Sequence, residues 1–149
     1  MKFLKTGLSC LLFIIMCSSA HALTKEFGPD FSRFSIDIPN NWTDYSRPGG
    51  VLLMSPDRLS EFGVIVEKNH DEADTYYIIN KLVGAYQFLK DLSIERTDSE
   101  GNTYKATASL DGRPFYMLVY SNKDTYAALT VIGYDAQLRS IYSTVTLKD

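Results

Sequence analysis

An Asp-Gly pair between two stretches of alternating apolar and polar residues restricts the fold more than any other feature of this sequence. Asp111-Gly112 has the composition of a two-residue hairpin turn, in which both residues adopt a positive φ. A two-residue turn determines which residues face one another. Counting outward from the turn predicts these pairs on one face: Leu110 with Arg113, Ala108 with Phe115, Ala106 with Met117, and Tyr104 with Val119.

The strand that follows this hairpin is expected over residues 125–134, after Asn122-Lys123-Asp124. A three-residue loop makes one face of the sheet wholly apolar, whereas a two-residue loop mixes the faces, so the three-residue register is preferred. It places Phe115, Met117 and Val119 beside Val131, Leu129 and Ala127. The opposite face then carries Tyr116, Tyr120, Tyr126, Thr130 and Tyr134.

This tyrosine face has two interpretations, and both stay open at this point. It is either the surface on which a C-terminal helix packs, or an amphipathic platform for a protein or an apolar ligand. Tyrosine suits the second use because it provides a large contact area at low entropic cost. The candidate partner-binding residues are Tyr116, Tyr120 and Tyr126.

The remaining pattern predicts further strands and two helices. Strands are expected at Phe34–Ile38, Val51–Met54 and Phe62–Val66, and at residues 94–96 before a turn at 99–102. From about Asp71 to Leu89 the apolar residues have helical spacing, and their stripe comprises Ile79, Leu82, Val83, Tyr86 and Leu89. The acidic residues Asp71, Glu72 and Asp74 suit the start of this helix.

Near the C-terminus, Asp135 is suited to cap a short helix, whose buried stripe is expected to comprise Leu138, Ile141, Tyr142 and Val145. Strands, a helix, hairpins and a second helix predict one α+β domain. Its antiparallel sheet is flanked by a long central helix and a short C-terminal helix.

The first 22 residues have the pattern of a bacterial export signal. Lys2 and Lys5 form a basic head, the apolar run Leu8–Met16 is well short of the ~20 residues that span a bilayer, and Ala20-His21-Ala22 fits a signal peptidase site. Residues 1–22 are therefore expected to be a cleaved signal and 23–149 a single domain, located in the periplasm or secreted. Lipid attachment at Cys17 is the minor alternative, because Met16 is larger than the small residue that normally precedes a lipidated cysteine.

Cleavage after Ala22 is the first testable prediction. The mass of the exported protein should correspond to a chain that begins at Leu23 and has no cysteine, because Cys10 and Cys17 are removed with the signal. Intact-mass spectrometry of the protein purified from the envelope fraction measures this directly. A mass that includes a lipidated Cys17 would contradict the prediction.

The chain beyond residue 22 lacks the residue patterns of most catalytic and cofactor sites. Its 13 basic and 18 acidic residues leave a net charge of −5, which argues against nucleic acid as a partner. His70 is its one histidine, no serine stands in a G-x-S-x-G motif, and Pro48-Gly49-Gly50 lacks the Lys-Ser/Thr of a phosphate loop. We therefore predict no catalytic, metal-binding or cofactor-binding residue, no cofactor, and no enzymatic activity.

Residues 34–42, read as Phe-Ser-Ile-Asp-Ile-Pro-Asn-Asn-Trp, resemble the opening F-S-(I/F)-D-(I/V)-P-x-x-W of the PsbP-like fold family. The motif describes a strand that ends at a Pro turn, with Trp42 packing back on the sheet. The resemblance extends as a pattern over most of residues 23–149, and it implies an antiparallel sheet between helices. Known relatives are non-enzymatic: an extrinsic photosystem subunit, a nuclear Ran-binding factor, DcrB-like bacterial envelope lipoproteins and adaptors for secretion effectors.

These observations lead to two main functional hypotheses, and to a third, weaker one, which is an enzyme built on carboxylates. The first is an exported, non-enzymatic accessory protein of the bacterial cell envelope that binds another envelope protein and has no transmembrane segment after signal cleavage. The alternative is a periplasmic carrier of a small molecule or lipid, with a pocket between the central helix and the sheet. A pocket lined by Tyr and Leu without a basic residue favours the carrier, and an exposed tyrosine patch favours the protein partner.

Overall fold

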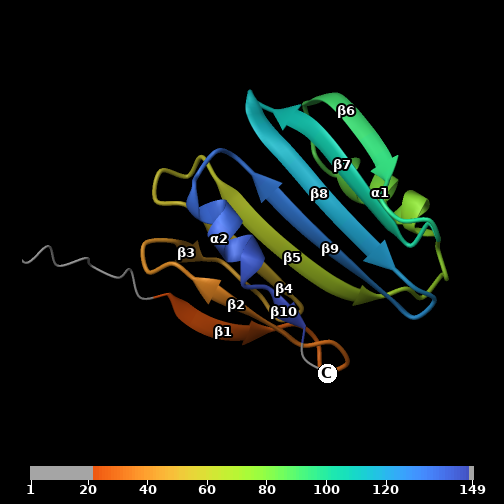
Figure 1. Ribbon diagram of the computed structural model, residues 1–149, viewed down its shortest axis with the longest axis horizontal. Helices are drawn as coiled ribbons and strands as arrows, with labels where there is room; N and C mark the ends of the chain where they lie inside the picture. The colour runs from red at the N-terminus through yellow and green to blue at the C-terminus, as the bar shows by residue number, and fades with distance from the viewer. Residues whose placement is uncertain (1–21, 148–149) are drawn as a thin grey trace, which may run out of the picture.

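The strands of the chain form two separate antiparallel sheets (Figure 1). The computed structural model describes residues 22–147. The larger sheet has seven strands, in the order β3 (Thr43–Asp44), β4 (Gly50–Met54), β5 (Glu61–Lys68), β9 (Thr125–Ile132), β8 (Arg113–Ser121), β7 (Thr103–Leu110) and β6 (Leu89–Arg96). The smaller sheet has three, in the order β1 (Leu23–Phe27), β2 (Phe34–Ile38) and β10 (Thr146–Leu147).

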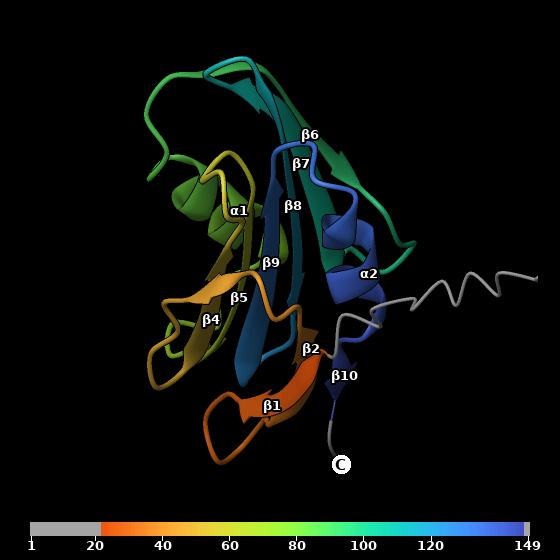
Figure 2. The same ribbon diagram turned by 90° about the vertical axis from the view of Figure 1, so that its left-hand side faces the viewer.

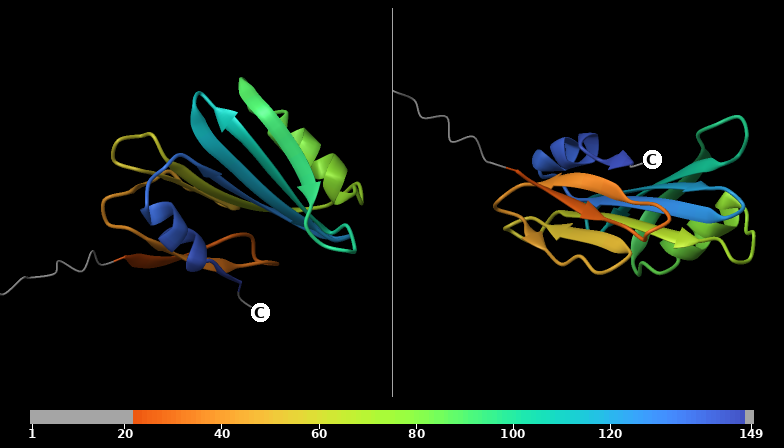
Figure 3. Two further views of the ribbon diagram at one scale, coloured as in Figure 1. Left: turned by 45° about the horizontal axis from the view of Figure 1, so that its top comes forward. Right: turned by 90° about the horizontal axis from the view of Figure 1, so that it is seen from below.

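The two helices cover opposite faces of the large sheet, so that the molecule has three layers (Figure 2). Helix α1 (Thr75–Val83) packs on β7 and β8. Helix α2 (Gln137–Ser143) and the small sheet lie on the other face, where α2 contacts β2 and β5. Two further views show that α1 lies at the β6–β8 end of the sheet, whereas α2 lies nearer β5 (Figure 3). The prediction of an α+β fold with an antiparallel sheet is confirmed.

The Asp-Gly hairpin has the predicted register throughout. Leu110 pairs with Arg113, and Ala106 pairs with Met117. Asp111 and Gly112 both have positive φ, 50° and 77°, as a two-residue turn of this kind requires. A local turn signal was sufficient here because the turn residues alone determine the pairing.

The predicted register between β8 and β9 is wrong by one residue. Met117 pairs with Thr130 rather than Leu129, because Lys123-Asp124 form a two-residue turn. The Asn122 side chain accepts hydrogen bonds from the backbone amides of both Asp124 and Thr125 and stabilises that turn. Apolar residues on both faces of β9 are buried, so alternation of polarity does not identify the face that each residue occupies.

The expected long central helix is also wrong, since α1 has nine residues and ends at Val83. Its start agrees with the sequence: the Asp74 carboxylate accepts a hydrogen bond from the Tyr77 amide. After the helix, Tyr86 and Leu89 still pack against the core beneath α1, from a turn and from β6 respectively. Helical spacing therefore continued in the sequence beyond the helix because the following residues are buried in the same cluster.

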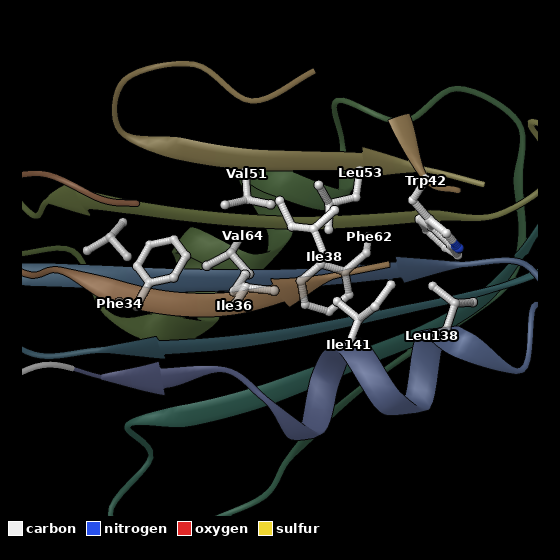
Figure 4. Packing of buried hydrophobic residues seen from close by; sticks show 11 residues of the cluster. Phe34, Ile36, Ile38, Trp42, Val51, Leu53, Phe62, Val64, Leu138 and Ile141 are labelled. Carbon is white, nitrogen blue, oxygen red and sulfur yellow. The ribbon is translucent and has the colours of Figure 1, made fainter. Parts of the chain in front are cut away.

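The core between the large sheet and the small sheet contains eleven buried residues, and ten of them are labelled in Figure 4. Leu138 and Ile141 of α2 point into this core, as predicted, and Trp42 lies at one end of it, also buried. Tyr142, which was expected to be buried, is instead 45% exposed. The N-cap of α2 is Ala136 rather than Asp135, although the Asp135 side chain, one residue earlier, accepts a hydrogen bond from the Gln137 amide.

The predicted signal, apart from Ala22, lies outside the described residues, as do Cys10 and Cys17. Within residues 22–147, no helix has both the length and the apolar character needed to cross a membrane.

Candidate functional site

The three candidate tyrosines do not share one face of the sheet. Tyr116 and Tyr120 lie on β8, on the side of the sheet that carries α2, beside Val131 and Ala127. Tyr126 packs against the core on the α1 side, and its hydroxyl donates a hydrogen bond to the Glu67 carboxylate. The one-residue error in the β8–β9 register explains this, because a slip by one residue moves every side chain of a strand to the other face.

Two other tyrosines join Tyr116 and Tyr120 on the α2 side. Tyr142, on α2, lines two adjacent hollows of about 620 Å³ and 400 Å³. Tyr116 and Tyr134 line the first of them, and Leu118 and Tyr120 line the second. We call this surface the α2–β8 groove and define it by Tyr116, Leu118, Tyr120, Tyr134 and Tyr142.

The smaller hollow of the α2–β8 groove has no charged residue among its described lining residues, whereas Asp135 and Arg139 line the larger one. Burial raises the pKa of Tyr116, and nearby Tyr142 raises it further, although Lys105 lowers it. The hydroxyl therefore stays protonated at neutral pH. Lys105, which acts on Tyr116, forms an ion pair with Glu95, and its Nζ lies 2.9 Å from Glu95 Oε2. Aromatic residues and arginine are both enriched at protein-binding surfaces relative to the rest of a protein surface.

A separate cavity lies on the opposite face of the large sheet, beside the end of α1. This α1-side cavity has a volume of about 370 Å³. Leu82, Ala85 and Tyr86 form one wall, and Gly63 and Thr130 belong to the sheet strands beneath them. None of the described residues that line it is basic, and Glu61 is the charged residue among them.

Residues considered for metal or acid–base chemistry are dispersed. His70 is exposed, and Asp71 and Glu72 beside it are exposed as well. Among residues 22–147, no three His, Cys, Asp or Glu side chains come together as a metal-binding group. Asp74 serves as the N-cap of α1.

Sequence reasoning missed the exposure of Tyr142, and it proposed a pocket between the central helix and the sheet without naming the residues that line it. Tyr142 falls on the apolar stripe of α2, so periodicity assigned it to the core, although it lies at the edge of that stripe and is exposed. The α1-side cavity had one signal in the sequence, which is Gly63 within the apolar run Phe62–Val66. A glycine inside a strand often marks a place where another group approaches the backbone closely.

Comparison with known proteins extends this description. Neither a scan against protein-family models nor a search of curated proteins gave a match. The solution structure of cyanobacterial PsbP (CyanoP) from Synechocystis sp. PCC 6803 is similar, with a TM-score of 0.50 and 14% sequence identity over 88% of this chain and 96% of that chain. A crystal structure from Bacteroides thetaiotaomicron VPI-5482 has a TM-score of 0.41 and 16% identity over 78% of this chain and 45% of that one.

At 14% identity the similarity to CyanoP concerns the fold and not the function. It agrees with the resemblance that begins at Phe34 and continues to Trp42. The chain therefore has a PsbP-like fold.

Proposed function

We propose that this protein is an exported, non-enzymatic accessory protein of the bacterial cell envelope, related to the DcrB-like proteins, that binds another envelope protein through the α2–β8 groove. The observation that carries this proposal is the gathering of four tyrosines from β8, α2 and the segment between β9 and α2. Tyr120, Tyr134 and Tyr142 are 47%, 78% and 45% exposed. Exposed aromatic side chains around hollows provide the anchor sites typical of protein interfaces.

Replacing Tyr120 with alanine tests this proposal. Capture of the partner from envelope extract should weaken by about 2 kcal/mol, or roughly thirtyfold, because interface tyrosines are frequent hot spots. The free energy of unfolding should change by less than ~1 kcal/mol, because the side chain is exposed. Pull-down with quantitative mass spectrometry and urea denaturation measure the two effects.

Tyr77→Ala is the matched control, because Tyr77 is similarly exposed but lies on α1, on the other face of the sheet. It should leave capture unchanged. Equal capture by the Tyr120 variant, the Tyr77 variant and the unmodified protein would refute the groove as the binding surface. A large loss of stability in the Tyr120 variant alone would show that this residue supports the fold instead.

The second candidate function is that of a small-molecule carrier, and the α1-side cavity favours it. The cavity lies between the end of α1 and the sheet, is largely apolar, and has tyrosine and leucine but no basic residue among its described lining residues. Its volume of about 370 Å³ lies within the range of ~300–1,000 Å³ found for small-molecule sites. The two functions use opposite faces of the molecule.

A further inference from the structure

Gly63 leaves space at the floor of the α1-side cavity, although the backbone at this position does not require glycine. Its neighbours Phe62 and Val64 fill the core on the other face of β5. Its φ is not in the left-handed region, and a Cβ there would lie 3.6 Å from the Val51 carbonyl oxygen and 3.9 Å from Thr130 Cβ. Both are ordinary contact distances, so a larger residue would fit at the cost of cavity space.

Gly50, on the adjacent strand, has less room for a side chain than Gly63. A Cβ at Gly50 would lie 3.1 Å from the Val64 carbonyl oxygen and 3.2 Å from Ile65 Cγ2, both unusually close. Glycine in the interior of a strand reduces stability because it has no side chain to pack and loses more entropy on folding. Gly63 therefore makes β5 less stable than a larger residue would, and the space left by its missing side chain belongs to the cavity.

Among the described residues that line the cavity, the polar side chains are Glu61, Tyr86 and Thr130, and none of them is basic. The Glu61 side chain is 28% exposed, so its carboxylate lies in contact with both the cavity and the solvent. Arg113 Nη1 approaches Glu61 Oε1 to 3.7 Å, which is too long for a hydrogen bond, and this nitrogen donates to the Leu59 carbonyl oxygen at 3.1 Å. The Glu61 carboxylate therefore has capacity to accept hydrogen bonds from a ligand.

The negative charge of Glu61 also affects the pKa of the Tyr86 hydroxyl. Burial raises the pKa of Tyr86 and the charge of Glu61 raises it further, whereas a hydrogen bond with Thr130 lowers it. Tyr86 is thus neutral at pH 7, and Glu61, whose Oε1 lies 3.7 Å from Arg113 Nη1, is the charged residue among the described residues that line the cavity. The free acceptor capacity of the Glu61 carboxylate favours a cationic ligand over an anionic one such as a fatty acid.

We propose that the α1-side cavity binds a small amphipathic amine, with the apolar body of the amine above Gly63 and its ammonium group at Glu61. This assignment rests on the carrier function proposed above and specifies its ligand class. The ammonium group stays partly in water at the exposed carboxylate, so that its desolvation is limited. The apolar body replaces the side chain that position 63 lacks.

Three probes of similar size and different charge test the ligand class on the purified exported protein. They are 2-phenylethylamine, 2-phenylethanol and 3-phenylpropanoate, titrated by NMR chemical-shift perturbation at pH 7. The amine should bind about tenfold more tightly than the alcohol, because a hydrogen bond to a charged group is the stronger. The carboxylate should bind more weakly than both. Glu61→Gln should remove the preference for the amine and keep the binding of the alcohol.

Gly63→Val tests the location of the site. It should abolish binding of all three probes while raising or maintaining the melting temperature, because valine favours strand structure and fills the cavity. Gly63→Ala should weaken binding less, and it provides the test if the valine variant does not fold. Tyr120→Ala is the control and should bind the amine unchanged, because Tyr120 lies on the opposite face.

The outcomes separate the ligand class from the carrier function. If the alcohol or the carboxylate binds as tightly as the amine and the Gly63 variants remove binding, the amine assignment is wrong and the carrier function stands. If no probe binds, or if the Gly63 variants bind normally, both the amine assignment and the use of this cavity are refuted. Preferential binding of the amine that depends on both Glu61 and Gly63 supports the proposal.

Discussion

Replacing Gly133 with alanine is expected to lower the free energy of unfolding by about 4 kcal/mol, from backbone strain and overpacking together. Gly133 follows β9 with φ of +100°, which alanine adopts only at a cost. An added Cβ would also clash with Ser60 Oγ and the Leu59 carbonyl oxygen, and would lie 2.8 Å from Ser60 Cα. The Leu59 carbonyl oxygen and Ser60 Cα are backbone atoms, so they cannot easily move away.

This close approach also positions α2. With Gly133 against Ser60, the Asp135 amide donates to Ser60 Oγ at 3.1 Å, and the Asp135 carboxylate then accepts from the Gln137 amide at 2.8 Å. The start of α2 and the neighbouring Tyr134 thus depend on this contact. A displaced Gly133 would disturb the α2–β8 groove as well as the stability.

Gly112→Ala is the matched control for this prediction. Gly112 also has a positive φ, +77°, but a Cβ there would meet nothing within 4 Å. Gly112→Ala should therefore lower the free energy of unfolding by only ~1–2 kcal/mol, which is the cost of placing a residue other than glycine in the left-handed conformation. Urea denaturation of both variants, followed by Trp42 fluorescence, gives the comparison. Equal losses of stability would mean that the contact with Ser60 does not exist.

The sequence predicted those parts of the fold whose signals are local. The Asp111-Gly112 turn determined a complete hairpin, and the alternation in Phe34–Ile38 identified β2 with its buried face. In contrast, β1 contains residues that are mostly exposed, and β10 has two residues, so neither has a hydrophobic pattern to detect. Within the small sheet, β1 and β2 pair locally, from Phe27 with Phe34 outward, whereas β10 pairs with β2 over a long sequence separation that a local pattern does not encode.

The candidate site was predicted in part for the same reason. Tyr116 and Tyr120 belong to the hairpin strand whose register the turn determined, and both lie on the face that was expected to receive the C-terminal helix. Tyr126 belongs to the next strand, where the loop length was misjudged, and it lies on the other face. Assignment to a face requires the register, and the register of β9 depended on a turn without an Asp-Gly signal.

A substitution in the small sheet has the second large expected effect. Phe34→Ala should lower the free energy of unfolding by about 3–5 kcal/mol, as large aromatic truncations in cores do. Phe34 on β2 is fully buried, and its ring packs near Phe27 with the centroids 6.1 Å apart. Within residues 22–147 the small sheet shares no strand pairing with the large sheet, so this core is the main contact between them.

Phe31→Ala is the control, because Phe31 lies three residues earlier and is 48% exposed. Its ring contacts the Lys68 ammonium group, whose nitrogen lies 5.6 Å from the ring centroid, so the expected loss is ~0.5–1 kcal/mol. A loss in the Phe34 variant as small as that in the Phe31 variant would mean that β2 does not pack on the large sheet as described.

Two probes show whether the layers unfold together in the Phe34 variant. Trp42, the one tryptophan of the chain, lies in the core between the sheets and reports on that layer, whereas far-ultraviolet circular dichroism reports on all strands and helices. Successive side chains of β5 and β9 point alternately into this core and into the core under α1. Loss of one core should therefore destabilise the other. We therefore expect the fluorescence and dichroism transitions to coincide in urea, as in two-state unfolding. A fluorescence transition at distinctly lower urea would show instead that the small sheet and α2 separate first from an intact seven-stranded sheet.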